Sequence, residues 1–147
     1  LEDSWHPDEY RMAKLTGNIA LELIRNGAAA TFDVNFSVMP QRFLNSGEEA
    51  KTFTSSGRIT NPTAQEAKPL LRVYGTGTFT IGSTSMQITA ANSYTDIDCE
   101  TMDAYYGATN RNSNISGTFP TLNPGQSGIT LGAGITKLQI TPRWWIL

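Results

Sequence analysis

The strongest constraint on the fold is the regular spacing of short β-type segments after residue 50. Runs rich in Thr, Val, Ile and aromatic residues alternate with turn residues about every 8–12 positions. This spacing is typical of a β-sandwich or barrel and not of βαβ units. We therefore expect an all-β fold built as an antiparallel β-sandwich, with a single helical turn near Asp103–Tyr106. The expected strands are Lys51–Thr54, Arg58–Thr60, Pro69–Tyr74, Thr78–Ile81, Ser85–Thr89, Tyr94–Glu100, Ile115–Gly117, Gly128–Leu131 and Ile135–Thr141.

The first 44 residues allow two interpretations. Apolar residues from Met12 to Leu23 fit a helical stripe, but Thr16-Gly17-Asn18 interrupts it, and glycine is a poor residue for a helix interior. We favour a β-meander, in which Thr16-Gly17-Asn18 is one turn and Asn26-Gly27 is a hairpin turn. Its strands are expected at Tyr10–Leu15, Ile19–Ile24 and Ala30–Met39.

The last of these strands has the clearest pattern in the chain. Phe32, Val34, Phe36 and Val38 alternate with polar residues, as in a strand with one buried face. Pro40 is expected to end the strand, because proline donates no ladder hydrogen bond.

Composition narrows the function. The 147 residues carry 11 Lys+Arg and 13 Asp+Glu, a net charge of -2, without a basic cluster that could neutralise phosphates. We therefore expect no nucleic-acid partner. No apolar run approaches the roughly 20 residues of a membrane helix, so no membrane partner is expected. One Cys and one His are too few for a disulfide framework or a Cys/His metal centre, and no cofactor or metal is expected.

Three carboxylates follow one another at alternate positions, in Asp96, Asp98 and Glu100. In a strand they would share one face, roughly 6.5–7 Å apart. Paired carboxylates serve acid–base chemistry in glycoside hydrolases, and oxygen clusters bind Ca²⁺. An extended strand splays its carboxylates, however, so we favour a solvated or interface-facing surface over a hydrolase site. The intervening Ile97 and Cys99 would then point into the core, where a lone cysteine is inert.

Two further features have plain structural interpretations. His6 stands beside carboxylates near the start of the chain, but no Ser or Cys nucleophile occurs in an elbow motif, so an exposed histidine is expected. Gly75-Thr76-Gly77 leads into another strand and not into a helix, which a dinucleotide fingerprint requires. We expect these glycines to permit a tight turn or bulge.

Aromatic residues are candidates for contact with a sugar or a protein partner. Aromatic faces beside polar side chains hold sugars, and exposed aromatics also mark protein interfaces. The candidates are Trp144, Trp145, Tyr105 and Tyr106, together with Tyr74 and Tyr94. Adjacent residues in a strand point to opposite faces, so at most one of the two Trp can line a given site and the other belongs to the core.

Several strings, in order along the chain, resemble the siphophage distal tail protein family. Asn61–Gly82 contains Asn-Pro-Thr, Lys-Pro and Val-Tyr-Gly-Thr-Gly, and Tyr94–Tyr105 contains Asp-Ile-Asp-Cys-Glu. Asn112–Leu147 contains Phe-Pro-Thr-Leu-Asn-Pro-Gly and ends in Pro-Arg-Trp-Trp-Ile-Leu. Thr31–Glu48 is similar to the strand and linker that join the two domains of these proteins. The resemblance covers about residues 30–147 and is looser before that.

The resemblance implies a structural virion protein of the phage or prophage distal tail, with no catalytic residues, produced in the bacterial cytoplasm. The family forms homo-hexameric rings that link the tail-tube protein to the tail-tip or tail-associated lysin protein. A galectin-like, jelly-roll-type sandwich projects from the ring as a platform for receptor-binding proteins.

The resemblance also implies the domain boundaries. Residues 1–45 would be the C-terminal part of the N-terminal ring domain, and residues 46–147 the galectin-like β-sandwich domain. Because the chain is short for the family and begins with Leu, we expect that roughly the first half of the ring domain is absent. The alternative function is a carbohydrate-binding module that contacts saccharide of the host cell wall.

Overall fold

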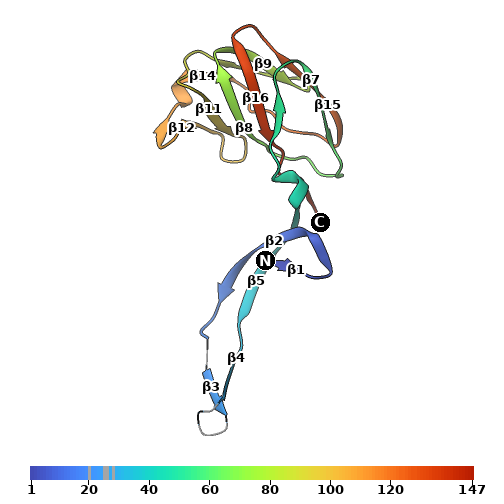
Figure 1. Ribbon diagram of the computed structural model, residues 1–147, viewed down its shortest axis with the longest axis vertical. Helices are drawn as coiled ribbons and strands as arrows, with labels where there is room; N and C mark the ends of the chain where they lie inside the picture. Colours follow the sequence, from blue (N-terminus) through green and yellow to red (C-terminus); the bar gives the residue numbers. More distant parts are fainter. Residues whose placement is uncertain (20, 25–26, 28) are drawn as a thin grey trace.

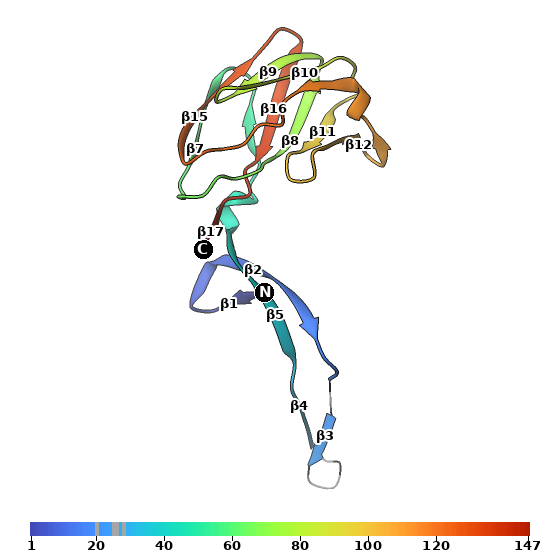
Figure 2. The same ribbon diagram turned by 180° about the vertical axis from the view of Figure 1, so that it is seen from behind.

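The computed structural model describes residues 1–19, 21–24, 27 and 29–147. Two antiparallel sheets face each other in a β-sandwich, and a long arm of paired strands projects from one end of it (Figure 1). The view from behind shows the same two parts, with the C-terminus at the base of the arm (Figure 2). The all-β antiparallel sandwich expected from the strand spacing is confirmed.

The sandwich consists of a five-stranded and a six-stranded sheet. The five-stranded sheet has the order β14 (Ile115–Gly117), β10 (Thr84–Ile88), β9 (Gly77–Ile81), β15 (Gly125–Leu131) and β7 (Gly57–Asn61). The six-stranded sheet has the order β13 (Thr109–Asn110), β12 (Asp103–Tyr106), β11 (Thr95–Asp98), β8 (Leu70–Gly75), β16 (Ile135–Thr141) and β6 (Lys51–Phe53). Two short 3₁₀ turns lie at η1 (Asn45–Gly47) and η2 (Asn112–Asn114).

The helical turn expected near Asp103–Tyr106 is wrong, because these residues form β12. Ala104 pairs with Ile97 of β11, and both side chains are fully buried. Pairing with β11 therefore decides the conformation of a segment too short to form a stable helix by itself.

The core lies between the two sheets, because buried apolar residues alternate with more exposed ones along strands such as β8 and β9. Leu71 and Val73 of β8 are fully buried on one side, and Phe79 and Ile81 of β9 are buried on the other. Trp144, which follows the last strand of the sandwich, is the largest fully buried side chain among the described residues. A buried aromatic of this size contributes roughly 2–3 kcal/mol or more to folding.

The Asn-Pro-Thr motif closes one end of this core. Asn61 is only 3% exposed. Its side-chain amide donates to the backbone carbonyls of Gln65 and Leu122, at 2.7 and 2.9 Å. Its side-chain oxygen accepts from the backbone N–H and the hydroxyl of Thr63, at 2.9 and 2.8 Å. Every polar group of this buried side chain is thus satisfied, as burial requires.

The chain crosses between the sheets twice at the same corner. β8 leads to β9 through Thr76, and β15 leads to β16 through residues 132–134. Gly75, Gly77 and Gly134 have φ of 98°, 135° and 90°. A Cβ atom on Gly75 would collide with the carbonyl oxygen of Gly134, and one on Gly134 would collide with that of Thr76. The tight turn expected at Gly75-Thr76-Gly77 is therefore present, and backbone contact explains its glycines.

The arm is one long antiparallel ribbon. β2 (His6–Thr16) pairs with β5 (Asn35–Leu44), and β3 (Leu21–Ile24) pairs with β4 (Ala29–Phe32) beyond them. At its base, β1 (Glu2–Asp3) pairs with β2, and β17 (Trp145–Ile146) pairs with β5.

The three-stranded meander expected before residue 45 is wrong. Thr16-Gly17-Asn18 does not reverse the chain, because Thr16 pairs with Asn35 and Leu21 pairs with Phe32 in the same ribbon. The pairing with β5 outweighs the local turn preference, since it extends the ladder past this point. The expected Asn26-Gly27 turn lies partly outside the described residues, which do not include Asn26.

The corner glycines give a test of the fold. We expect Gly134→Ala to lower the free energy of unfolding by about 1–3 kcal/mol, because it forces a side chain into a left-handed conformation against the Thr76 carbonyl. Gly128→Ala is the matched control, because Gly128 lies in β15 with ordinary φ and with open space where its Cβ would stand. Urea unfolding followed by tryptophan fluorescence measures both. Equal stability of the two variants would contradict the account.

Candidate functional site: the arm and its junction with the sandwich

The ribbon of β2 and β5 has one apolar face. Ala13 lies opposite Val38 and Leu15 lies opposite Phe36, and opposed residues of an antiparallel pair share a face. The intervening pairs, such as Lys14 with Ser37, give the other face its polar side chains. The alternation therefore produces an apolar face at Phe36 and Val38.

The single strand expected from Ala30 to Met39 is wrong, because β4 ends at Phe32 and β5 begins at Asn35. Pro40 does not end the strand either, since β5 continues to Leu44.

No layer of the described structure covers that face. Leu15 is 48% exposed and Phe36 is 47% exposed. Among the described residues, the exposed large hydrophobic side chains gather in the arm and, with Leu147, at its base, and only Met102 lies in the sandwich. The arm members are Leu1, Trp5, Met12, Leu15, Ile19, Phe32, Val34, Phe36, Val38 and Met39. An exposed apolar patch of this kind marks an interaction site.

The arm also leaves backbone edges open. Pairing with β17 and Trp144 covers Arg42, Phe43 and Leu44 of β5, and pairing with the first residues of the chain covers His6, Tyr10 and Arg11 of β2. The remaining outer edges of both strands present N–H and C=O groups that can pair with another strand. A two-stranded ribbon is marginal in water without a third strand or a packed layer. The arm therefore has the properties of an incomplete sheet that another layer completes.

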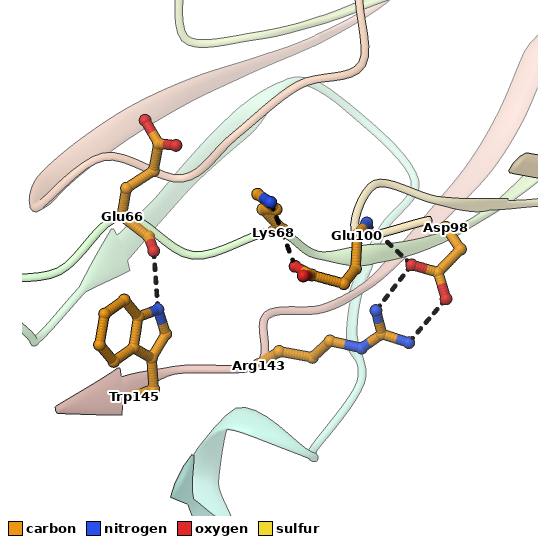
Figure 3. Close-up of polar contacts among 6 residues, drawn as sticks. All are labelled: Glu66, Lys68, Asp98, Glu100, Arg143 and Trp145. Carbon is orange, nitrogen blue, oxygen red and sulfur yellow. Dashed lines mark hydrogen bonds and ion pairs between the residues drawn. The ribbon is translucent and has the colours of Figure 1, made fainter. Parts of the chain in front are cut away.

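The last residues of the chain tie the arm to the sandwich. Trp144 is 1% exposed and packs in the sandwich core, whereas the next residue, Trp145, pairs with Phe43 of the arm. The indole N–H of Trp145 donates to the carbonyl of Glu66 at 2.8 Å (Figure 3). One Trp in the core and its neighbour outside it agrees with the sequence expectation. It also removes Trp144 from the candidate contact residues, because its buried side chain reaches no ligand.

The backbone conformation of Arg143 turns the chain from the sandwich back toward the arm. Its φ of 59° is left-handed, which turns the chain sharply out of the sandwich. Its guanidinium donates twice to the carboxylate of Asp98, at 2.7 and 2.9 Å (Figure 3). Burial alone would raise the pKa of Asp98, but the hydrogen bonds from Arg143 and from the backbone of Glu100 and Thr101 outweigh burial and lower it.

The entering strand is fixed against the returning one. The backbone N–H of Leu44 donates to Trp144 and that of Arg143 donates to Gly47, at 2.9 and 2.8 Å. A Cβ on Gly47 would collide with the backbone nitrogen of Trp144, so this crossing needs glycine.

Side chains add further bonds within the base of the arm and one bond from the arm to Glu48, at the start of the sandwich domain. The Tyr10 hydroxyl donates to the Glu48 carboxylate at 2.6 Å, and the Tyr10 ring stacks on Phe43. Burial, together with the bond to Glu48, raises the pKa of Tyr10 to about 12. Arg42 donates to Glu9 at 3.1 Å and to the carbonyl of Leu147 at 2.9 Å.

The three alternating carboxylates do not converge. Asp96 pairs with Arg72 and Asp98 pairs with Arg143, each through two hydrogen bonds. Glu100 lies beyond the end of β11, which stops at Asp98, so the expected strand to Glu100 is two residues too long. It forms an exposed ion pair with Lys68 at 3.5 Å (Figure 3). Each carboxylate has its own cation, which gives no pair for acid–base catalysis.

The residues between these carboxylates are buried as expected. Ile97 is fully buried and Cys99 is 4% exposed. Burial, with the nearby charge of Asp98, raises the pKa of Cys99 to about 12, so its thiol stays protonated and unreactive at neutral pH.

The remaining candidates lie in β12 and at the base of the arm. Tyr105 and Tyr106 are half-buried in β12, and the Tyr106 ring packs on Tyr94 with centroids 4.8 Å apart. His6 is exposed at the start of β2. In the part of the chain that the structure describes, no three His, Cys, Asp or Glu side chains gather as a metal site requires. Over the same residues, no helix is long and apolar enough to cross a membrane.

Sequence reasoning missed the cations of this region and the role of Gly47. Arg143 lies 45 residues from Asp98 in the sequence, so no local pattern joins them. The one available signal was the carboxylate series itself, since half-buried carboxylates need cationic partners.

Comparison with known proteins adds no relative. No protein-family model, no curated protein and no solved structure matches the chain.

The Arg143–Asp98 pair gives a test of the junction. We expect Arg143→Gln to lower the free energy of unfolding by about 1–3 kcal/mol, because it leaves a half-buried carboxylate without its cation. Lys68→Gln is the matched control, because its pair with Glu100 is exposed and is worth at most about 1 kcal/mol. Chemical unfolding at pH 7 measures both, and equal effects would contradict a structural role for Arg143.

The same pair predicts a pH dependence. The pKa of Asp98 is lower in the folded chain than its ordinary value of 3.8. Its stabilising contribution is therefore complete above pH values near 4 and is lost as pH falls through the folded value. The difference in the free energy of unfolding between the wild type and Arg143→Gln should shrink as the pH is lowered from about 6 to about 2. A difference that stays constant with pH would contradict the assignment.

Proposed function

We propose that the chain is a structural subunit of a phage tail, a siphophage distal tail protein that links the tail tube to the tail tip. The observation that carries this proposal is the uncovered apolar face of the arm. Ala13, Leu15, Phe36 and Val38 form a face that water does not stabilise, on a ribbon whose outer edges can accept further strands. Such a feature belongs to a subunit that becomes complete in an assembly.

The proposed place of the arm is in the ring. By the resemblance, residues 1–45 are the end of a ring domain, whose remaining strands and neighbouring subunits would cover the apolar face. The ring, a homo-hexamer, would contact the tail-tube protein on one side and the tail-tip or tail-associated lysin protein on the other. The low charge of the chain, 16% of residues, suits surfaces that meet neighbours and not solvent.

The sandwich would serve as the outward platform for receptor-binding proteins, with the galectin-like architecture that the resemblance implies. The junction supports this role, because two strands cross it side by side. Hydrogen bonds between Leu44 and Trp144 and between Gly47 and Arg143 join these strands. A platform held in this way keeps a fixed orientation relative to the arm, which a docking surface in a symmetric particle needs.

Immunogold electron microscopy tests the proposed function. Antibodies raised against the purified chain are applied to the phage, or to the induced lysate, of the strain that encodes it. We expect gold particles at one end of the tail tube, where it meets the tail tip. Labelling along the whole tube, on the capsid, or on no particle at all would overturn the proposal.

The arm gives a variant with a matched control. We expect Phe36→Glu to reduce incorporation of the protein into tails at least about tenfold, because a charge on the apolar face cannot be buried against a partner without a cation. Met102→Glu should be incorporated normally, since Met102 is 63% exposed but lies in the sandwich, outside the arm. Quantitative blotting of purified tails measures both. Normal incorporation of Phe36→Glu would contradict the proposed role of the arm.

A further inference from the structure

The outer face of the six-stranded sheet carries a row of polar side chains that no part of the junction uses. Gln139 of β16 pairs with Arg72 of β8, which pairs with Asp96 of β11. The row extends at both ends, with Thr52 of β6 beside Gln139 and Tyr105 of β12 beside Asp96. Residues directly opposite one another share a face, so this row crosses five neighbouring strands.

A cavity lies over the middle of this row. Its volume is about 240 Å³, and its lining residues are Ala50, Leu70, Arg72, Asp96, Gln139 and Thr141. The volume is below the roughly 300–1,000 Å³ of pockets for drug-sized molecules, so the cavity suits a ligand about the size of one sugar ring. Leu70 and Ala50 give it an apolar part, and the other four residues supply hydrogen-bonding groups.

The charges in the cavity are balanced. Arg72 donates from Nε and Nη2 to the two oxygens of Asp96, at 2.6 and 2.9 Å. The Asp96 side chain is only 8% exposed, whereas that of Arg72 is 43% exposed. Because a guanidinium has five N–H groups and Asp96 takes two, three remain for other partners. A neutral ion pair of this kind suits a ligand with neutral hydroxyl groups and not a free anion.

The polar groups are also held in place before any ligand arrives. The Tyr74 hydroxyl donates to the Gln139 side-chain oxygen at 3.1 Å, and Gln139 donates to Thr52 at 3.3 Å. Arg72 stacks over the Tyr94 ring, 4.2 Å from its centre. Side chains that are fixed in the free protein lose little conformational entropy on binding. The tyrosines of this face therefore position the ligand-binding groups and do not stack on the ligand.

We propose that this cavity is a saccharide-binding site that takes one uncharged pyranose ring. Neighbouring ring hydroxyls would accept hydrogen bonds from Arg72 and donate to the side-chain oxygens of Asp96 or Gln139, while Leu70 would contact a C–H face. Of the aromatic residues that the sequence put forward, Tyr74, Tyr94 and Tyr105 border this site, and neither Trp does. It goes beyond the proposed tail function and does not depend on it, because a sandwich face can bind saccharide whatever assembly carries it.

The test is a titration followed by nuclear magnetic resonance. The ¹⁵N-labelled chain is titrated to millimolar levels with D-glucose, D-galactose, D-mannose and N-acetyl-D-glucosamine, which present different patterns of hydroxyl groups. We expect at least one sugar to shift the Arg72 Nε–H and Gln139 side-chain amide signals in a saturable way. The absence of a saturable shift with all four sugars would overturn the proposal.

Matched variants locate the binding. We expect Gln139→Ala to weaken the binding about tenfold, because it removes hydrogen bonds at the cavity. Gln126→Ala is the control, since Gln126 accepts a similar bond from Arg58, at 3.2 Å, but lies on the five-stranded sheet. Thr141→Val, which keeps the side-chain shape, should also weaken binding and serves if Gln139→Ala does not fold. Equal weakening by Gln126→Ala, or unchanged binding in both cavity variants, would overturn the assignment.

Discussion

The structure depends on two consecutive residues that belong to different parts of the molecule. Trp144 fills the sandwich core, and Trp145 pairs with the arm. The left-handed conformation of Arg143 and its two hydrogen bonds to Asp98 stabilise the point where the chain leaves the sandwich and joins the arm. Without this return, the arm would be joined to the sandwich by the single chain passage through η1. With it, two adjacent strands cross the junction, and the apolar face of the arm is presented in a defined direction.

The sandwich and the arm differ in how much of their hydrophobic side-chain surface each buries within the chain. Phe79 and Ile81 are buried between two sheets, as a stable isolated unit requires. Phe36 and Leu15 are nearly half exposed, although their pattern is that of a buried face. The sandwich is thus complete within the described chain, and the arm is not. This contrast supports the proposal that the arm mediates assembly and that the sandwich provides a binding surface.

The sequence predicts the sandwich well because its determinants are local. The expected strand Ile135–Thr141 and the glycines at the Gly75-Thr76-Gly77 corner correspond to features of the structure. Asp103–Tyr106 departs from the prediction because pairing with β11 outweighs its weak local preference. Thr16-Gly17-Asn18 has turn residues but lies within a long ribbon, so the distant strand β5 decides its geometry.

The candidate sites were harder to predict, because their partners are distant in sequence. Asp96 and Asp98 look like a pair from their spacing, yet Arg72 and Arg143 neutralise them separately. The polar cavity depends on the register between β8 and β16. This register makes neighbours of Arg72 and Gln139, which lie 67 residues apart in the sequence. No periodicity indicates such a register. The exposure of the apolar face of the arm could not be predicted either, since alternation predicts an apolar face but not what covers it.

Hydrogen–deuterium exchange of the arm tests the central claim most directly. Backbone amides of residues 11–16 and 35–41 are followed in the purified chain and in tails isolated from the phage or lysate that contains it. The account predicts rapid exchange in the purified chain and strong protection in the tails, because assembly would cover the apolar face and pair the open edges. Equally rapid exchange in both samples would show that the arm has no partner in the tail, and would contradict the account.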